Sequence, residues 1–166
     1  MGLLGDSRRI VLFLGEFEHT IDKQRRVAIP RTWREESMNL VIIPGRCKTL
    51  LAVSPEKAKE MMSKLTSGSF ANPDIARAMT AIGSFSSSCV CDKQGRVPLT
   101  KKQMDYAGIV SDVVFVGAFD SMQIWSKENK EAQDLDIEDV LNVIQGIQEQ
   151  PSDVDSALSS LFDKGK

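Results

Sequence analysis

Residues 89–100 read CVCDKQGRVPLT, and residues 19–30, seventy positions earlier, read HTIDKQRRVAIP. Their six-residue cores, DKQGRV and DKQRRV, are identical at five positions. In both places a polar turn runs into alternating apolar residues, Val27 and Ile29 in the first and Val97 and Leu99 in the second. That alternation is typical of a half-buried β-strand. The chain therefore encodes the same local structure twice.

The similarity extends well beyond the two turns. Residues 41–45 align with residues 113–117, and residues 50–54 align with residues 122–126. Each copy of this repeat spans about 40 residues, and its pattern predicts a strand, a polar turn, a second strand, a short helical piece and two more strands. One such unit has too few strands to bury a sheet face alone. We therefore expect the two copies to exchange strands and close a small barrel.

Helix signals surround the two copies. Four typical helix starts are Ser54-Pro55, Asn72-Pro73-Asp74, Asp136 and Ser152. The last two precede apolar stripes at helical spacing, namely Ile137, Val140, Leu141, Ile144 and Ile147, and then Val154, Leu158, Leu161 and Phe162. We interpret both stripes as core or subunit packing. The expected organisation is an N-terminal extension (1–12), repeat 1 (13–66), a connecting helix (67–85), repeat 2 (86–132) and an acidic helical C-terminal segment (133–166).

Charge is distributed unevenly along the chain. The net charge is only −2, yet residues 127–166 hold ten acids against four lysines. Residues 19–34 instead hold five cations against one acid, Asp22. Three cysteines provide no disulfide framework, which favours a reducing, cytoplasmic setting. No apolar run approaches the roughly 18 residues that a membrane span needs, and two arginines interrupt the apolar N-terminal patch, so we expect neither a membrane anchor nor a signal peptide.

Residue types used in catalysis and metal binding are sparse. His19 is the only histidine, and with Cys47, Cys89 and Cys91 it could complete a zinc set. However, Cys89 and Cys91 have C-x-C rather than the usual C-x-x-C spacing. The serines at 86–88 have no base near them in the sequence, and nucleotide-binding and zinc-hydrolase motifs are absent. We therefore expect no catalytic residues, metal, cofactor or small-molecule substrate.

The arginines of the two turns suit contact with nucleic acid. Arg26 and Arg96 each offer a rigid fork of donors that matches phosphate or the O6 and N7 atoms of guanine. Asp22 and Asp92, four residues earlier, are candidates to orient these guanidinium groups. The alternative is that each Asp–Arg pair only holds its own turn together. Trp33 and Trp125 could stack on bases, but both occupy apolar-periodic positions, so we assign them to the core.

These motifs resemble those of the MraZ family. LGEFEHTIDKQRRVAIPRTWRE resembles its opening repeat, and VCDKQGRVPLT followed by VVFVGAFDSMQIWS resembles its second, over about residues 13–130. The resemblance implies a mainly β fold with flanking helices (α+β), an AbrB-like swapped-hairpin β-barrel formed by the two repeats of one chain. It also implies a ring-like homo-oligomer. In function it implies a bacterial transcription regulator that binds direct repeats upstream of its own division and cell-wall gene cluster.

The two copies differ at informative positions. Arg25 stands where copy two has Gly95; if the turn needs a positive φ, either Arg25 is strained or the first turn is reshaped. Gln103-Met104 replaces Trp33-Arg34, so we expect copy two to contact DNA less than copy one. The predicted DNA-binding residues are Lys23, Arg25, Arg26, Arg31, Arg34, Lys93 and Arg96, with Asp22 and Asp92 as orienting residues.

The expected protein is therefore a cytoplasmic, nucleoid-associated regulator whose partners are double-stranded DNA and further copies of itself. The alternative keeps the fold and changes the role, to an oligomeric scaffold or antitoxin-type module whose main partner is another protein. The acidic helical segment at residues 133–166 motivates that alternative.

Overall fold

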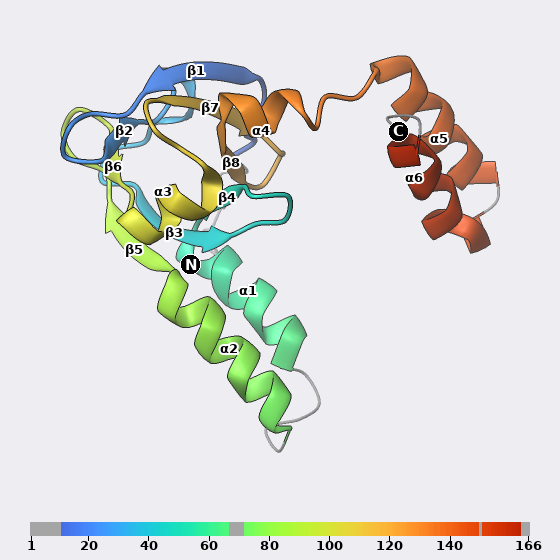
Figure 1. Cartoon of the computed structure of the whole chain (residues 1–166), viewed down its shortest axis with the longest axis horizontal. Helices are drawn as coiled ribbons and strands as arrows, with labels where there is room; N and C mark the ends of the chain where they lie inside the picture. Colours follow the sequence, from blue (N-terminus) through green and yellow to red (C-terminus); the bar gives the residue numbers. More distant parts are fainter. Residues whose placement is uncertain (1–10, 67–71, 150, 164–166) are drawn as a thin grey trace, which may run out of the picture. The chain divides into compact units, whose positions relative to one another are not determined.

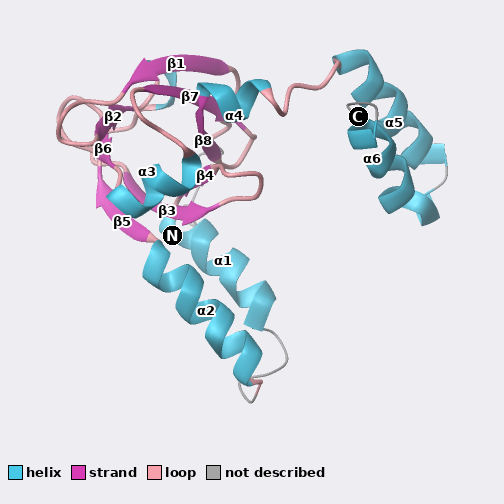
Figure 2. Cartoon of the chain, viewed as in Figure 1, coloured by secondary structure: helices cyan, strands magenta, loops and turns pink. Residues whose placement is uncertain are grey.

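A computed structural model describes residues 11–66, 72–149 and 151–163. The chain forms two compact units that divide between Lys130 and Glu131. Within the described residues, the first unit holds every strand and the second is helical (Figures 1 and 2). The α+β class predicted from the sequence is confirmed.

Each copy of the repeat folds in the predicted order. The first contains β1 (Glu16–Thr20), β2 (Arg26–Ala28), the 3-10 turn η1 (Arg31–Trp33), β3 (Asn39–Pro44), β4 (Leu50–Val53) and α1 (Pro55–Thr66). After α2 (Pro73–Phe85), the second contains β5 (Ser87–Val90), β6 (Arg96–Pro98), α3 (Lys101–Ala107), β7 (Asp112–Gly117), β8 (Met122–Ser126) and α4 (Lys127–Glu131). The second unit contains α5 (Ile137–Glu149), the 3-10 turn η2 (Pro151–Asp153) and α6 (Val154–Asp163).

The two copies exchange strands. The six-stranded antiparallel sheet has the order β1-β7-β8-β4-β3-β5, so the first strand of each copy pairs with the third strand of the other. β4 and β8 meet in the middle of the sheet. The two remaining strands, β2 and β6, pair with each other as a separate antiparallel ribbon in which Val27 lies opposite Val97. Neither copy could form this arrangement alone. Apart from the hairpins β3–β4 and β7–β8, every strand pair joins one copy to the other.

The described strands do not close into the barrel that we expected. β1 and β5 are the two edges of the large sheet, and neither pairs with the β2–β6 ribbon. The polar turns explain this result. Each turn separates the first two strands of its copy, and the three-residue strand that follows pairs with its counterpart. The ribbon is therefore joined to the sheet by packing rather than by a hydrogen-bonded ladder.

The core lies where the ribbon meets the sheet. Val27, Ile29, Val97 and Leu99 are fully or almost fully buried and pack in one cluster with sheet residues such as Phe115. The predicted alternation is therefore confirmed, because these four positions point inward from the ribbon and the residues that follow it. Burying such side chains stabilises the fold by about 1.5–3 kcal/mol each.

Both tryptophans are buried, as predicted, Trp33 within this cluster and Trp125 outside it. Trp33 is 4% exposed and Trp125 is 6% exposed. The indole N–H of Trp33 donates to the carbonyl oxygen of Leu14 at 3.1 Å. Its ring makes edge-to-face contacts with Phe13, Phe17 and Phe115 at centroid distances of 5.7, 5.2 and 6.3 Å. Trp33 thus joins the N-terminal strand region to β7.

The helix starts were predicted with one error. Side-chain oxygens of Ser54, Asn72 and Asp136 accept backbone N–H bonds at the starts of α1, α2 and α5, as predicted. Ser152 was expected to cap the last helix, but it lies inside η2, and α6 begins at Val154. Pro151 favours this tight turn because its fixed φ suits a first helical position. Among the described residues, no helix is long and apolar enough to cross a membrane.

We expect Trp33→Ala to lower the free energy of unfolding by about 3–5 kcal/mol, because it removes a large buried ring and leaves a cavity. Urea denaturation followed by circular dichroism measures this change. Thr32→Ala is the matched control, since Thr32 is exposed on the same turn and its substitution is expected to stay within about 0.5 kcal/mol. Equal stability of the two variants would contradict the role of Trp33 in the core.

Candidate nucleic-acid interface

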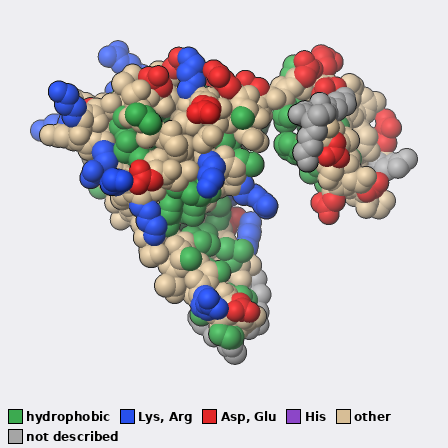
Figure 3. Space-filling model, in the orientation of Figure 1, with side chains coloured by type: hydrophobic (Ala, Val, Ile, Leu, Met, Phe, Trp, Pro, Cys, Tyr) green, Lys and Arg blue, Asp and Glu red, His purple; other side chains and the backbone are tan. Residues whose placement is uncertain are grey.

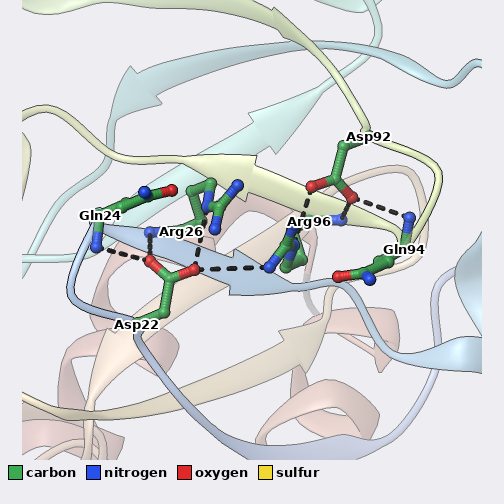
Figure 4. Close-up of polar contacts among 6 residues, drawn as sticks. All are labelled: Asp22, Gln24, Arg26, Asp92, Gln94 and Arg96. Carbon is green, nitrogen blue, oxygen red and sulfur yellow. Dashed lines mark hydrogen bonds and ion pairs between the residues drawn. The ribbon is translucent and has the colours of Figure 1, made fainter.

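Each polar turn is closed by its aspartate. In the first turn Asp22 Oδ1 accepts the backbone N–H groups of Gln24 at 2.8 Å and Arg26 at 2.9 Å. Asp22 Oδ2 accepts the Arg26 Nε–H at 2.9 Å. The carboxylate therefore satisfies two backbone donors that the tight turn leaves without a strand partner. It also fixes the direction of the arginine side chain (Figure 4).

The second turn repeats this geometry. Asp92 Oδ1 accepts the backbone N–H groups of Gln94 and Arg96, each at 2.9 Å, and Asp92 Oδ2 accepts the Arg96 Nε–H at 2.8 Å. The arginine side chains keep about 30% of their surface exposed, 31% for Arg26 and 29% for Arg96. Each Asp–Arg pair therefore holds its own turn together, while part of each arginine side chain remains accessible.

Arg25 adopts the backbone conformation of the glycine that it replaces. Its φ is 58°, and Gly95 at the matching position has a φ of 74°. The first turn is therefore strained rather than reshaped. For a residue with a Cβ atom the left-handed conformation costs about 1–2 kcal/mol. The side chain of Arg25 is exposed, so packing does not offset this cost.

The two turns are linked across the ribbon. Arg96 Nη1 lies 3.7 Å from Asp22 Oδ2, so the first aspartate faces both arginines. The backbone N–H of Leu99 donates to Arg25 O at 2.8 Å, and the backbone N–H of Ile29 donates to Gly95 O at 2.9 Å. Figure 4 shows Gln24 and Gln94 at opposite ends of the ribbon with Arg26 and Arg96 between them. The two turns thus form one continuous surface, which we call the ribbon face (residues 22–26 and 92–96).

Arg34 lies over the second turn although it belongs to the first copy. Its Nε–H donates to Ile29 O at 2.6 Å. A Cβ atom at Gly95 would lie within 3 Å of the Arg34 side chain, which therefore occupies the space that the glycine leaves open. The sequence predicted a cation at this position but not its neighbour, because Arg34 and Gly95 are distant in the chain. Met104 takes the corresponding position in copy two.

Most of the predicted DNA-binding cations are exposed. Lys23 and Arg25 in the first turn, Arg31 in η1 and Lys93 in the second turn all have exposed side chains. Lys101 and Lys102 at the start of α3 are also exposed; Lys101 pairs with Asp105 at 2.8 Å. Figure 3 shows Lys and Arg side chains along the edge of the molecule where β2 and β6 lie. The carboxylates in both turns are bound to arginines, so the cations dominate this surface.

The side chains considered as metal or catalytic groups pack or form hydrogen bonds within the fold. His19 lies in β1 with its ring 5.6 Å from that of Phe115, and burial, followed by the nearby Arg34 charge, lowers its pKa. Burial also raises the pKa of the Cys89 thiol to about 11, which disfavours the thiolate that binds metal. Ser86 Oγ donates to Ile82 O, and Ser87 Oγ accepts from the side chain of Gln103. Across residues 11–66, 72–149 and 151–163, no three metal-binding side chains gather.

The comparisons with known proteins concern this same repeat region. Residues 86–138 match a family model described as "MraZ protein, putative antitoxin-like". The chain is 36% identical over 119 residues to "Transcriptional regulator MraZ" of Thermoanaerobacter sp. (strain X514), covering 70% of this chain and 82% of that protein. It is 35% identical over 118 residues to the protein of that name from Carboxydothermus hydrogenoformans, again covering 70% and 82%. The Moorella thermoacetica protein is 34% identical over 121 residues, covering 72% and 85%.

The two turn aspartates predict how stability depends on pH. Hydrogen bonds from the backbone and side chain of the following arginine hold the pKa values of Asp22 and Asp92 below the ordinary 3.8. A lowered folded-state pKa contributes stability above the ordinary value, and this contribution is lost as the pH falls through the folded-state value. We therefore expect the free energy of unfolding to fall in the window below about pH 4, and Asp22→Asn/Asp92→Asn to remove this part of the decline.

Urea unfolding between pH 7 and pH 3 measures this dependence. His19 contributes separately, because its pKa is below 6.5 and its effect therefore begins at higher pH. Asp105→Asn is the control for loss of a carboxylate outside the ribbon face. An unchanged acid decline in the Asp22→Asn/Asp92→Asn variant would show that the turn carboxylates do not carry it.

Proposed function

The chain belongs to the MraZ family, and from this membership and the ribbon face we propose that it is a sequence-specific DNA-binding transcription regulator. Its relatives are named transcriptional regulators. We further propose that it binds direct repeats in the duplex upstream of its own gene, in the division and cell-wall cluster that the family resemblance implies. It would then act in the cytoplasm, associated with the nucleoid.

The single observation that carries this proposal is the doubled Asp–Arg turn on one surface. Each arginine uses its Nε–H on the aspartate of its own turn. The Nη groups of Arg26 remain to donate elsewhere, whereas Nη1 of Arg96 also faces Asp22 Oδ2 at 3.7 Å. A guanidinium group held at a fixed angle loses little entropy when it meets guanine or phosphate. Asp22 and Asp92 would therefore act as orienting residues, and Arg26 and Arg96 as readers of the base edges in the major groove.

Arg25 supports the same role through its strain. A residue with a Cβ atom persists in a left-handed conformation where something else favours its side chain, and Gly95 provides the unstrained alternative at the matching position. Because the Arg25 side chain is exposed, it would contribute to binding rather than to folding. We propose that its guanidinium group contacts a phosphate.

The remaining cations would contact the DNA backbone. We propose phosphate contacts for Lys23, Arg31 and Lys93, whose side chains are exposed. Arg34 would contribute its charge through the Nη groups, since its Nε–H is bonded to Ile29 O. Phosphate contacts of this kind give affinity and register but little sequence discrimination. Discrimination would therefore come from Arg26 and Arg96.

Several copies acting together would raise the affinity. We propose a ring-like homo-oligomer, because neighbouring subunits of a ring are related by rotation without inversion, which suits repeats in the same orientation. Linked contacts bind at a high effective concentration, so weak single-copy binding becomes strong over tandem sites.

Fluorescence anisotropy with the duplex just upstream of this protein's gene tests the proposal. Beside a scrambled duplex of equal composition at about 150 mM salt, we expect a preference of about a hundredfold, equivalent to about 2.7 kcal/mol. If about four to seven phosphates are neutralised per protomer, the slope of log K against log salt is expected to be roughly −4 to −6. Equal, weak and salt-sensitive binding to both duplexes would reject sequence reading by the ribbon face.

Three substitutions on the ribbon face separate DNA contact from folding. Arg26→Ala is expected to weaken binding tenfold or more, about 1.4 kcal/mol, and Arg96→Ala to weaken it less. Arg25→Gly is expected to weaken DNA binding while raising the free energy of unfolding by about 1 kcal/mol, because glycine accepts the positive φ without strain. Anisotropy and urea denaturation on the same preparations measure the two effects.

Arg25→Lys is the control for Arg25→Gly, since it keeps both the charge and the strained backbone. Stronger loss in Arg96→Ala than in Arg26→Ala would reverse the order of the two copies. Unchanged affinity in Arg25→Gly would remove Arg25 from the contact set.

A further inference from the structure

The second unit is a helical hairpin with a small apolar contact between its two helices. Leu161 near the end of α6 is buried, and it lines a hollow with Leu135 and Asp139 around the start of α5. The two helices therefore run antiparallel. Val143 and Ile147 on α5 and Ala157 on α6 are half-buried. In residues 131–149 and 151–163, these side chains between the two helices are the whole core of the unit.

A second apolar stripe on each helix faces solvent. Ile137, Leu141 and Ile144 follow one another at i, i+4 and i+7 along α5, and Val154, Leu158 and Phe162 do so at i, i+4 and i+8 along α6. These six side chains are between 36% and 65% exposed. They were expected to pack in a core or between subunits, but within this unit they do not. We call them the hairpin face.

Helical geometry places the two stripes on the same side of the hairpin. Successive residues of a helix are about 100° apart around its axis. On both helices the exposed stripe lies roughly 80–100° around the axis from the side that packs against the other helix, and in the same direction. Because the helices run antiparallel, equal rotations bring the stripes to one surface. An exposed apolar surface of this kind, with polar residues around it, marks a site of protein interaction.

The charge around the hairpin face limits what can cover it. Residues 131–149 and 151–163 contain nine carboxylates and no lysine, arginine or histidine. Glu138 lies three residues before Leu141 on α5, and Asp155 lies three residues before Leu158 on α6, so each carboxylate flanks the apolar stripe of its helix. DNA would be repelled. A second hairpin of the same kind would bring like charges together around the apolar contact, which disfavours self-association.

A partner that suits this surface has an apolar helix face with cations on its flanks. We propose that the hairpin face binds an amphipathic α-helix of another protein, whose aliphatic stripe packs against Leu141 and Leu158 and whose lysines or arginines pair with the flanking carboxylates. Docking of such a helix is a recurrent mode of peptide recognition. The match to the family model ends at residue 138, two residues into α5. The proposed interaction uses residues of the second unit only, and none of the ribbon face.

A synthetic helical peptide tests this inference on the full chain. The probe is a leucine-striped peptide of about 18 residues, long enough to form a helix, flanked by lysines; its partner probe has glutamates at the same positions. Anisotropy is measured at about 150 mM salt, where charges more than about 8 Å apart are screened. We expect saturable binding of the lysine peptide, at least tenfold stronger than binding of the glutamate peptide.

Matched variants identify the surface. Leu141→Asp/Leu158→Asp is expected to weaken peptide binding at least tenfold, whereas Asn142→Asp/Ser159→Asp adds the same charge one residue away on each helix and is expected to have little effect. Circular dichroism checks that both variants keep the helices, whose altered residues are exposed. Equal binding by both variants, or equal binding of both peptides, would overturn the proposal.

Sedimentation velocity of the same variants tests the competing occupant. If Leu141→Asp/Leu158→Asp lowers the oligomeric state of the full chain and the control variant does not, the hairpin face is covered by a second copy and the proposal is wrong. An unchanged oligomeric state, together with loss of the peptide, supports a separate basic partner. DNA affinity is expected to stay within twofold in both variants.

Discussion

The structure depends on the pairing of β2 with β6 around Val27 and Val97. This ribbon is only three residues long on each side, too short to be stable from its own hydrogen bonds. It persists because its inner face is buried against the sheet and because an aspartate closes the turn before each strand. The contact between Asp22 and Arg96 then ties one turn to the other. The burial of Val27 and Val97 and the positions of the two turn arginines depend on this pairing.

The two copies have diverged around that shared frame. Copy two has glycine at the strained position of the turn, and the space over it is taken by Arg34 from copy one. Copy one has Arg25 at the strained position, and Met104 of copy two stands at the place that corresponds to Arg34 of copy one. Each end of the ribbon therefore carries one extra guanidinium group, delivered from a different position in the chain. A nearly symmetric surface charge is thus retained although the sequences of the copies differ.

The two units of the chain also differ in the charge of their surfaces. Cations gather on the ribbon face of the first unit, while the hairpin of the second unit carries carboxylates beside an exposed apolar stripe. A polyanion suits the first surface, and a basic amphipathic helix suits the second. A net charge of −2 conceals both surfaces, because it sums their opposite charges.

The sequence by itself determined the repeat, the strand and helix order, three helix starts and the burial of both tryptophans, because periodicity, capping side chains and turn residues act over a few neighbouring positions. It also indicated the Asp–Arg turns, since both partners lie four residues apart. Tertiary structure alone decided that the sheet stays open, that Arg34 covers Gly95 and that Asp22 reaches Arg96. These contacts join residues about sixty to seventy-four positions apart, and local propensity carries no information at that separation. It also decided which apolar stripe is covered: helical spacing placed Leu141 and Leu158 on one side of their helices, but only packing left that side exposed.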